Sequence, residues 1–428
     1  MVTLPPVNTD TAGKSTHSDP DAAALRAALV DRIADRHRQL DLVLPPEVEA
    51  VMRRVPRHLF TPGASLQQAY SLDSVVTKSD EHGVMLSTVS APPTVAMMLG
   101  QLGELSGKRV LEIGSGGYNA ALLRELVGPD GSVTSIDIDQ DVVDRARACL
   151  AKAGYRDVRV LRMDGESAAP EFGPWDRIVV TVGAWEVPTA WVEQLTDDGR
   201  LVVPLRTFGL TRSWAFRRRG DALESLSHLL CGFVPIQGMG EHRGRGVPLH
   251  GEQVGLWLDE GQQVDEAALS GVLASPRAQV WSGVTVGRRQ PFHDQDLWLA
   301  GNLRGFALLT AKQQAVEAGV VSPSWRLGTP AVADGGSLAY RAKLRSVDPE
   351  QTTYEFGAYG HGPDGAGVAE RLAEQIRRWD QLNRPSPHMT VHPASTPDAE
   401  LPHGYVLAKR HSKIVISWPD HDGMVNSP

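Results

Sequence analysis

The sequence predicts an α/β fold with a doubly wound sheet of parallel strands, followed by a C-terminal α+β region. Short apolar runs alternate with helical periodicities between Lys108 and Leu205, as expected of a parallel sheet that helices cover on both faces. Beyond residue 252 the apolar runs carry interleaved polar residues, which is typical of antiparallel strands. The 428 residues are enough for two ordinary domains.

Composition divides the chain into four expected segments. Residues 1–20 are polar and predicted to be a disordered tail, whereas residues 21–240 form the α/β region and begin with a helix over Ala22–Leu40. Residues 241–251 are predicted to be a linker, and residues 252–428 form the α+β region with a helix around 368–379. The strands expected there are Gln253–Leu258, Ser337–Arg345, Thr352–Tyr359, Tyr405–Lys409 and Lys413–Trp418.

The segment Lys108–Asp137 predicts a site for a nucleotide-type ligand. The apolar run Val110–Ile113 predicts a buried strand, and the glycine turn Gly114–Gly117 follows it at once. After a helical segment, a second strand over Val133–Ile136 ends at Asp137. A glycine turn lets backbone approach a ligand closely, and an acid about 20 residues further on can bind two ribose hydroxyls.

Two ligands compete for this segment, a dinucleotide and S-adenosylmethionine (AdoMet). A dinucleotide site prefers G-x-G-x-x-G, with the pyrophosphate at the helix N-terminus. Here the run Gly114–Ala120 (GSGGYNA) has alanine near the position of the third glycine, so it fits the dinucleotide pattern only loosely. The opening LEIGSG, with Glu112 before the turn, resembles the first motif of class I AdoMet-dependent methyltransferases, which have a Rossmann-like doubly wound sheet.

Polar residues at the ends of later strands extend the predicted site. Asp164 follows one strand-like run, and Thr181 lies at the end of another. Because ligands bind at the carboxyl ends of parallel strands, we expect both residues to converge with Gly114 and Asp137. Each acid taken alone is equally compatible with a turn or a helix cap.

Residues from about Leu44 to Met239 resemble the protein-L-isoaspartate O-methyltransferases. TVSAP at Thr88–Pro92 is distinctive for this family among methyltransferases. The other segments that carry the resemblance, in the same order as in the family, are Val55–Phe60 (VPRHLF), Trp175–Ala184 (WDRIVVTVGA), Val187-Pro188, Asp198–Pro204 (DGRLVVP) and Gly232–Pro235 (GFVP).

The resemblance implies AdoMet as methyl donor, S-adenosylhomocysteine as its product, and a set of site residues. Ser90 and Thr88 are the implied catalytic residues. The implied acceptor-binding residues are Ser90, Val182, Gly183 and Ala184. The implied cofactor-binding residues are Ser87, Thr88, Val89, Glu112, Gly114, Ser115, Gly116, Asp137, Ile138, Asp164, Gly165, Thr181 and Gln237.

Methylation of a carboxylate needs no strong general base, because the acceptor is already ionised near neutral pH. Positioning and desolvation of the acceptor are expected to dominate. The Ser90 hydroxyl is expected to donate a hydrogen bond to that carboxylate or to bind the cofactor, without acting as a nucleophile. The alternative for Ser90 is a helix cap before Pro92-Pro93.

The chain departs from the family pattern in three places. The glycine run is one residue shorter, the segment Thr77–Leu86 is longer and more acidic, and the chain continues far beyond Gln237. With EIGSGGYNAALL and the segment Leu205–Ser213, the extension resembles a subgroup encoded with ribosomally made, modified peptides, especially lanthipeptides. That subgroup implies methylation of a peptide aspartate, whose ester closes to an aspartimide that persists or hydrolyses to isoaspartate.

Three functions stay open. The first is AdoMet-dependent methylation of an aspartate in a modified precursor peptide, the second is repair of isoaspartyl damage in proteins, and the third is a non-catalytic peptide-binding scaffold. Residues 252–428 favour the first, because a repair enzyme handles many short flexible sites and needs no dedicated domain. The set Gly114–Gly116, Asp137, Asp164 and Ser90 argues against the third. The oligomeric state is left open.

Composition limits the classes of binding partner and the cellular location that can be expected. A net charge of -8 gives no indication of general affinity for nucleic acid or anionic membranes. With no apolar span of about 18 or more residues and no signal core, a cytoplasmic location is expected. Cys149 and Cys231 make no disulfide framework. The spacing of His242, His250, His293, His361 and His403 matches no metal motif, so no metal ligand is expected among them.

Overall fold

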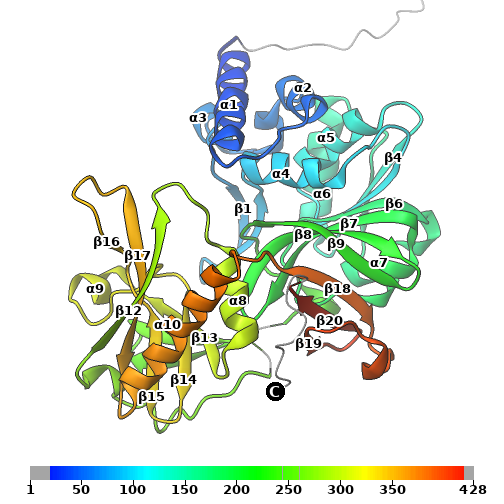
Figure 1. Ribbon diagram of the computed structural model, residues 1–428. Coiled ribbons are helices and arrows are strands. Elements are labelled where there is room, and N and C mark those ends of the chain that lie inside the picture. Colours follow the sequence, from blue (N-terminus) through cyan, green and yellow to red (C-terminus); the bar gives the residue numbers. More distant parts are fainter. Residues whose placement is uncertain (1–19, 243, 260, 419–428) are drawn as a thin grey trace, which may run out of the picture. The chain divides into compact units, whose positions relative to one another are not determined.

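The computed structural model describes residues 20–242, 244–259 and 261–418. Chain packing divides it into two compact units, Met1–Met163 and Asp164–Pro428, and each is described by itself (Figure 1). Apart from Pro20, the predicted disordered tail lies outside the described residues.

The first unit begins with helices and a β-hairpin. The apolar stripe Leu29, Val30 and Ile33 of the first helix is buried, as the predicted helix requires. The second helix starts with a proline, which suits a first turn where the backbone N–H has no helical partner. The elements are α1 (Pro20–Gln39), α2 (Pro46–Arg54), η1 (Arg57–Phe60), α3 (Leu66–Ala69), β1 (Val75–Ser79), β2 (Met85–Val89) and α4 (Pro92–Leu102).

Three parallel strands follow in the order β3-β4-β5, joined by helices. Their apolar residues are buried on both faces, as a doubly covered sheet demands. Helix α6 ends at Gly154 in the left-handed conformation, with φ of 90°. The predicted strand–helix alternation is therefore confirmed. The elements are β3 (Arg109–Ile113), α5 (Tyr118–Val127), β4 (Ser132–Asp137), α6 (Gln140–Ala153) and β5 (Arg159–Arg162).

The second unit contains a sheet with strands from both ends of its sequence. Its order is β19-β20-β18-β9-β8-β7-β6, with β6 and β7 parallel and the remaining pairs antiparallel. Figure 1 shows the late strand β18 beside the green β9, with which it pairs. The elements are η2 (Gly165–Ser167), η3 (Pro170–Phe172), β6 (Trp175–Val180), α7 (Thr189–Glu193), β7 (Leu195–Thr207), β8 (Leu210–Arg219), β9 (Ala222–Leu230), η4 (Gly238–Gly240), β18 (His388–Pro393), η6 (Asp398–Glu400), β19 (Tyr405–Ala408) and β20 (Ser412–Ser417).

An antiparallel sheet occupies the rest of this unit, in the order β10-β11-β13-β14-β15-β17-β12, with β16 paired to β17. Helix α10 lies on β12, β15 and β17 (Figure 1). Its predicted apolar stripe is buried. The elements are β10 (Arg245–His250), β11 (Val254–Leu258), η5 (Val272–Ala274), β12 (Ala278–Gly287), α8 (Asp294–Asn302), β13 (Phe306–Ala311), α9 (Gln313–Glu317), β14 (Thr329–Asp334), β15 (Ser337–Arg341), β16 (Arg345–Ser346), β17 (Thr353–His361) and α10 (Gly365–Gln381).

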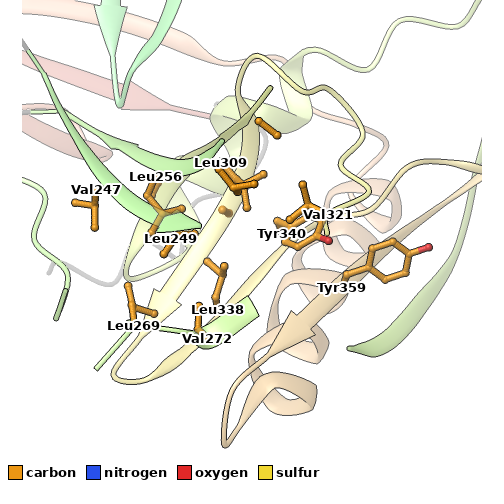
Figure 2. Close-up of a cluster of buried hydrophobic side chains, with 14 of the residues drawn as sticks. Val247, Leu249, Leu256, Leu269, Val272, Leu309, Val321, Leu338, Tyr340 and Tyr359 are labelled. Carbon is orange, nitrogen blue, oxygen red and sulfur yellow. The ribbon is translucent and has the colours of Figure 1, made fainter. Parts of the chain in front are cut away.

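Two sequence-based expectations change here. The segment 241–251 was expected to be a plain linker, but it contains β10, whose alternating residues Val247 and Leu249 are buried in the core of the antiparallel sheet (Figure 2). The predicted strands at 405–409 and 413–418 exist, yet they belong to the sheet that contains β6–β9. The region 252–428 is thus shared between two sheets.

Candidate functional site

The glycine turn after β3 requires glycine at two of its positions. Gly114 has φ of 97° and Gly117 has φ of 79°, both in the left-handed region that side chains disfavour. A Cβ on Gly117 would also lie 3.1 Å from Cδ1 of Phe60. The Gly114 N–H donates to the Ile136 carbonyl at 2.8 Å, so the turn is fixed to β4.

Asp137 ends β4 and braces the same turn. Its Oδ2 accepts the N–H of Ser115 at 2.9 Å, and its Oδ1 accepts the N–H of Asp139 at 3.0 Å. Burial raises the pKa of this carboxyl, and the two backbone N–H groups oppose that rise. Asp137 is half-buried, and each carboxylate oxygen can accept a second hydrogen bond. It therefore keeps the capacity to bind two hydroxyls.

Glu112 has a supporting place in the structure. It is fully buried, accepts a hydrogen bond from Nδ2 of Asn119 at 2.9 Å, and contacts the Ser135 hydroxyl, which in turn lies 2.9 Å from the hydroxyl of Ser115. Its carboxyl therefore positions the glycine turn from beneath, while a direct cofactor contact by Glu112 stays a prediction. Burial raises the pKa of Glu112 to about 7.

Glu112→Gln is expected to stabilise the protein more near pH 8 than near pH 5. The pKa of Glu112 is raised from 4.5 to about 7 on folding, so folding favours the protonated carboxyl. The stability that this proton gives is fully present below a pH of about 4.5 and is lost as the pH rises through about 7. Glutamine stays neutral, so the unfolding free energy of Glu112→Gln relative to wild type should increase by about 2–3 kcal/mol between pH 5 and pH 8.

Urea unfolding of wild type and variant at both pH values measures this change. Glu81→Gln, at a side chain that is exposed, is the control and should show no such growth. An advantage of Glu112→Gln that is the same at both pH values would contradict the prediction.

The hairpin β1–β2 is held against the start of α6. The Ser87 hydroxyl accepts from Nη2 of Arg145 and from the Thr77 hydroxyl, each at 3.1 Å. Nζ of Lys78 contacts the carboxylates of Asp139 at 2.5 Å and Asp141 at 2.8 Å. These contacts fix the segment that leads to Ser90, while a cofactor contact by Ser87 itself stays a prediction.

The segment after Ser87 reaches the glycine turn. A Cβ on Gly116 would lie 3.7 Å from the Thr88 carbonyl oxygen and 3.9 Å from Cα of Val89, so these two predicted residues border the turn. Ser90 is half-buried, but it is not the helix cap: Ala91 is the N-cap residue of α4, and no side chain of the described chain caps this helix. The alternative of a purely capping serine is therefore wrong.

Arg57 is a residue to which the sequence assigned no role. Its buried guanidinium donates from Nε to the Ala69 carbonyl at 2.8 Å and from Nη2 to the Val89 carbonyl at 3.3 Å, and it lies over the Tyr118 ring. Burial lowers its pKa to about 10. Arg57 thus ties the segment before Ser90 to the start of α5. The motif VPRHLF was the available signal.

The predicted site residues of the second unit also gather around shared loops. Oδ1 of Asp164 accepts the Glu166 N–H and Oδ2 accepts the Met239 N–H, each at 3.0 Å. Gly183 donates to the Val234 carbonyl at 2.8 Å and accepts from the Ile236 N–H at 2.9 Å. Asp164 is thus a cap residue as well as a site candidate. Cofactor roles of Ile138, Asp164, Gly165, Thr181 and Gln237, and acceptor roles of Val182, Gly183 and Ala184, stay predictions.

Three charged residues that the sequence did not point to join these loops. Nη2 of Arg410, in the turn between β19 and β20, contacts Glu166 and lies 2.9 Å from Oε1 of Glu186. It also donates to the Met239 carbonyl at 3.1 Å, while the His411 N–H donates to Glu186 at 2.9 Å. Both glutamates are buried, and burial raises the pKa of Glu166 whereas the Arg410 charge opposes that rise.

An aromatic contact strengthens this junction. Nζ of Lys409 lies 3.6 Å from the centroid of the Trp185 ring, and the His242 ring stacks on Trp185 with 4.0 Å between the ring centroids. Residues 409–411 therefore close against the loop 183–186, which contains two of the predicted acceptor-binding residues. Nothing local in the sequence could have revealed a contact across more than 220 positions.

None of the helices in residues 20–242, 244–259 and 261–418 is long and apolar enough to cross a membrane. The cytoplasmic location stays a prediction.

Comparisons with known proteins agree with this geometry. Residues 28–241 match the family "Protein-L-isoaspartate(D-aspartate) O-methyltransferase". A protein-L-isoaspartate O-methyltransferase of Methanopyrus kandleri is 37% identical over 49% of this chain and 91% of its own length. A second, "Protein-L-isoaspartate O-methyltransferase 2" of Archaeoglobus fulgidus, is 40% identical over 49% of this chain and 92% of its own.

A solved structure of such an enzyme from Plasmodium falciparum, in complex with S-adenosyl-L-homocysteine, covers 50% of this chain and 98% of its own at 18% identity, with a TM-score of 0.43. The assignment rests on the sequence comparisons, which confirm the class I fold. The glycine turn and the half-buried Asp137 fit AdoMet as cofactor. The chain belongs to the protein-L-isoaspartate(D-aspartate) O-methyltransferase family and is an AdoMet-dependent carboxyl methyltransferase.

Proposed function

We propose that this protein methylates a side-chain carboxylate of a peptide and that residues 242–428 restrict the acceptor to a dedicated, modified peptide. The observation that carries the proposal is the junction of Arg410 with Glu166 and Glu186. The family match ends at residue 241, yet a residue far beyond that point contacts the loops that bear the predicted acceptor-binding positions. An extension with no role in binding the acceptor would not need a contact with these loops.

One set of residues would bind the cofactor, and another would position the acceptor. AdoMet, when bound, supplies a methyl group on a sulfonium centre. Asp137 would accept hydrogen bonds from the ribose hydroxyls, and the turn Gly114–Gly116 would let backbone approach the ligand closely. Ser90 would donate a hydrogen bond to the acceptor carboxylate and hold it in line. No group of the protein has to remove a proton, since the acceptor is ionised.

Ser90→Ala is expected to lower kcat by the equivalent of about 1–3 kcal/mol, because one hydrogen bond to a charged group is lost. The dissociation constant of AdoMet should stay within about twofold of wild type, since this loss falls on the acceptor. Ser90→Thr, which keeps a hydroxyl, should recover part of the rate, and Ser106→Ala on the surface is the control. Full turnover combined with weak AdoMet binding would contradict the assignment.

The preferred acceptor is an aspartate in a ribosomally made, modified peptide of the lanthipeptide kind. This choice rests on the sequence resemblance of the extension to that subgroup and on the junction at Arg410. Once the ester forms, the backbone nitrogen of the next residue attacks the ester carbonyl, loses its proton, and expels methanol. The product is a five-membered aspartimide, which persists or adds water to give isoaspartate. This second step needs no group of the protein.

Repair of isoaspartyl residues in damaged proteins is the second candidate. It is favoured by the names of the relatives, both of which are protein-L-isoaspartate O-methyltransferases. The two candidates share cofactor and chemistry and differ only in the acceptor.

Mass spectrometry of three separate reactions with AdoMet distinguishes them. The acceptors are a linear isoaspartyl peptide, its linear L-aspartyl counterpart, and a thioether-bridged ring peptide with one L-aspartate. The proposal expects an ester and then an imide on the ring peptide. Methylation of the linear isoaspartyl peptide alone would support repair. No product from any of the three peptides despite bound AdoMet would contradict both candidate acceptors.

A further inference from the structure

Within the described residues, two clusters of ligand-type side chains lie outside the predicted cofactor site. The first, Glu166, Glu186 and His411, is already neutralised, because Arg410 contacts both carboxylates. The second consists of His228 on β9 with His293 and Asp294 at the start of α8. Among the described residues no arginine or lysine pairs with its Asp294 carboxylate, and the predicted chemistry makes no use of this cluster.

The three donor atoms of the second cluster have the spacing of metal ligands. His228, His293 and Asp294 each offer one ligand atom, and these three atoms all lie within 4.8 Å of one another. Oδ1 of Asp294 is 3.6 Å from Nε2 of His228 and 3.3 Å from Nε2 of His293. In a tetrahedral zinc site with bonds of about 2.0–2.1 Å, neighbouring ligand atoms are about 3.3–3.4 Å apart.

A hydrogen bond orients the Asp294 carboxylate for metal binding, and its oxygen Oδ1 has no hydrogen-bond donor among the described residues. Oδ2 of Asp294 accepts a hydrogen bond from the Ser386 hydroxyl at 2.6 Å. Oδ1 is buried and, within the described part of the chain, accepts no hydrogen bond. A buried oxygen of a carboxylate without a partner is costly, and a cation between the three side chains would remove that cost.

Burial favours neutral imidazoles in this cluster. Burial lowers the pKa of His228 to about 4 and also lowers the pKa of His293, with Asp294 opposing both shifts. Neutral imidazole is the form that binds metals. Arg212, which donates to the His293 carbonyl at 3.3 Å, works against a cation here, but it is paired with Asp296 at 3.4 Å. Arg341 shares that aspartate at 2.7 Å.

We propose that His228, His293 and Asp294 bind one zinc ion, with the Ser386 hydroxyl or a water as the fourth ligand. The hydroxyl lies 3.3 Å from Nε2 of His228. The ion would join β9 to the start of α8 and to the segment that leads into β18. This replaces the expectation that His293 is not a ligand. Motif spacing could not reveal the site, because one ligand stands on a strand far from the other two in sequence.

Metal titration of the full-length, tag-free protein tests the proposal. After treatment with a chelator and its removal, the protein is titrated with Co²⁺, whose visible absorption reports tetrahedral coordination, and then with Zn²⁺. We expect one equivalent of Co²⁺ to bind with a tetrahedral spectrum and to be displaced by Zn²⁺. Bound zinc should also raise the unfolding temperature.

Asp294→Asn, which removes one of the three protein ligands, and the double variant His228→Gln with His293→Gln, which removes two, should each weaken binding at least about 100-fold. His250→Gln, at an exposed position on β10, is the matched control and should bind as wild type. Folding of each variant is checked by circular dichroism. The proposal is overturned if the folded wild-type protein binds no stoichiometric metal at micromolar concentrations, or if the ligand variants bind as tightly as wild type.

Discussion

Replacing Asp137 with alanine is expected to weaken AdoMet binding by at least about 10–100-fold, which is the loss of one hydrogen bond to a charged group at about 1.5–3 kcal/mol. The carboxylate stands at the end of β4 and has acceptor capacity left beyond its bonds to the Ser115 and Asp139 N–H groups. Its loss removes the partner of two ribose hydroxyls and also loosens the glycine turn through Ser115. Both effects weaken the binding of AdoMet.

Calorimetry with AdoMet and with S-adenosylhomocysteine measures this loss. Asp137→Asn keeps the shape and one acceptor oxygen, so its loss should be smaller than that of alanine. Asp144→Ala, on the exposed side of α6, is the control and should leave affinity unchanged. Binding by Asp137→Ala at the wild-type affinity would refute the assignment of this residue to the ribose.

Arg410→Met is expected to lower the free energy of unfolding by about 2 kcal/mol near pH 8. Removing one partner of a buried ion pair costs about 3–5 kcal/mol, and the half-exposed Arg410 side chain reduces that figure through solvent screening. Glu166 and Glu186 would remain as two buried, adjacent carboxylates without their cation. The loop 183–186 would lose its anchor, so KM for the peptide should rise while AdoMet affinity holds.

The stability deficit of Arg410→Met should depend on pH in a defined direction. Without the Arg410 charge, the pKa of Glu166, already raised by burial, rises further. A carboxyl whose pKa is raised on folding stabilises the protein at low pH and loses that contribution as the pH rises. The deficit should therefore be larger near pH 8 than near pH 5.

Arg377→Met is the matched control for Arg410→Met, since Arg377 also pairs with two glutamates, but these glutamates are exposed on α10. It should cost less than about 0.5 kcal/mol at either pH. Equal deficits for the two arginine variants would mean that the junction at Arg410 does not anchor the loop. Ending the chain near Gly244 is a poorer test, because it also removes β18 and leaves β9 as an unpaired edge.

The glycine turn and Asp137 could be predicted because their signal is local. A buried strand, glycines with positive φ, and an acid at the end of the next strand all lie within one short segment. The periodicity of α10 likewise predicted a helix with a buried stripe. Local patterns also placed the strands near residues 405 and 413 correctly, but strand periodicity does not say which sheet a strand joins.

The contacts that lie far apart in sequence could not be predicted. The pairing of β18 with β9 and the contact of Arg410 with Glu166 depend on which distant segments the fold brings together. No single segment of the sequence encodes that. Glu112 shows a different reason: its motif indicated the cofactor site, but the sequence did not reveal that its carboxyl is fully buried and accepts a hydrogen bond from Asn119. Ser90 was compatible with a cap until the structure gave that position to Ala91.

A competition assay tests the restriction of the acceptor most directly. The full-length protein and AdoMet are mixed with equal concentrations of a linear isoaspartyl peptide and a thioether-bridged ring peptide with one L-aspartate. The ratio of initial methylation rates, followed by mass spectrometry, gives the ratio of the two kcat/KM values. The proposed function predicts that the ring peptide is methylated faster and then forms the imide. Preferential methylation of the linear isoaspartyl peptide, with the ring peptide left unchanged, would contradict it.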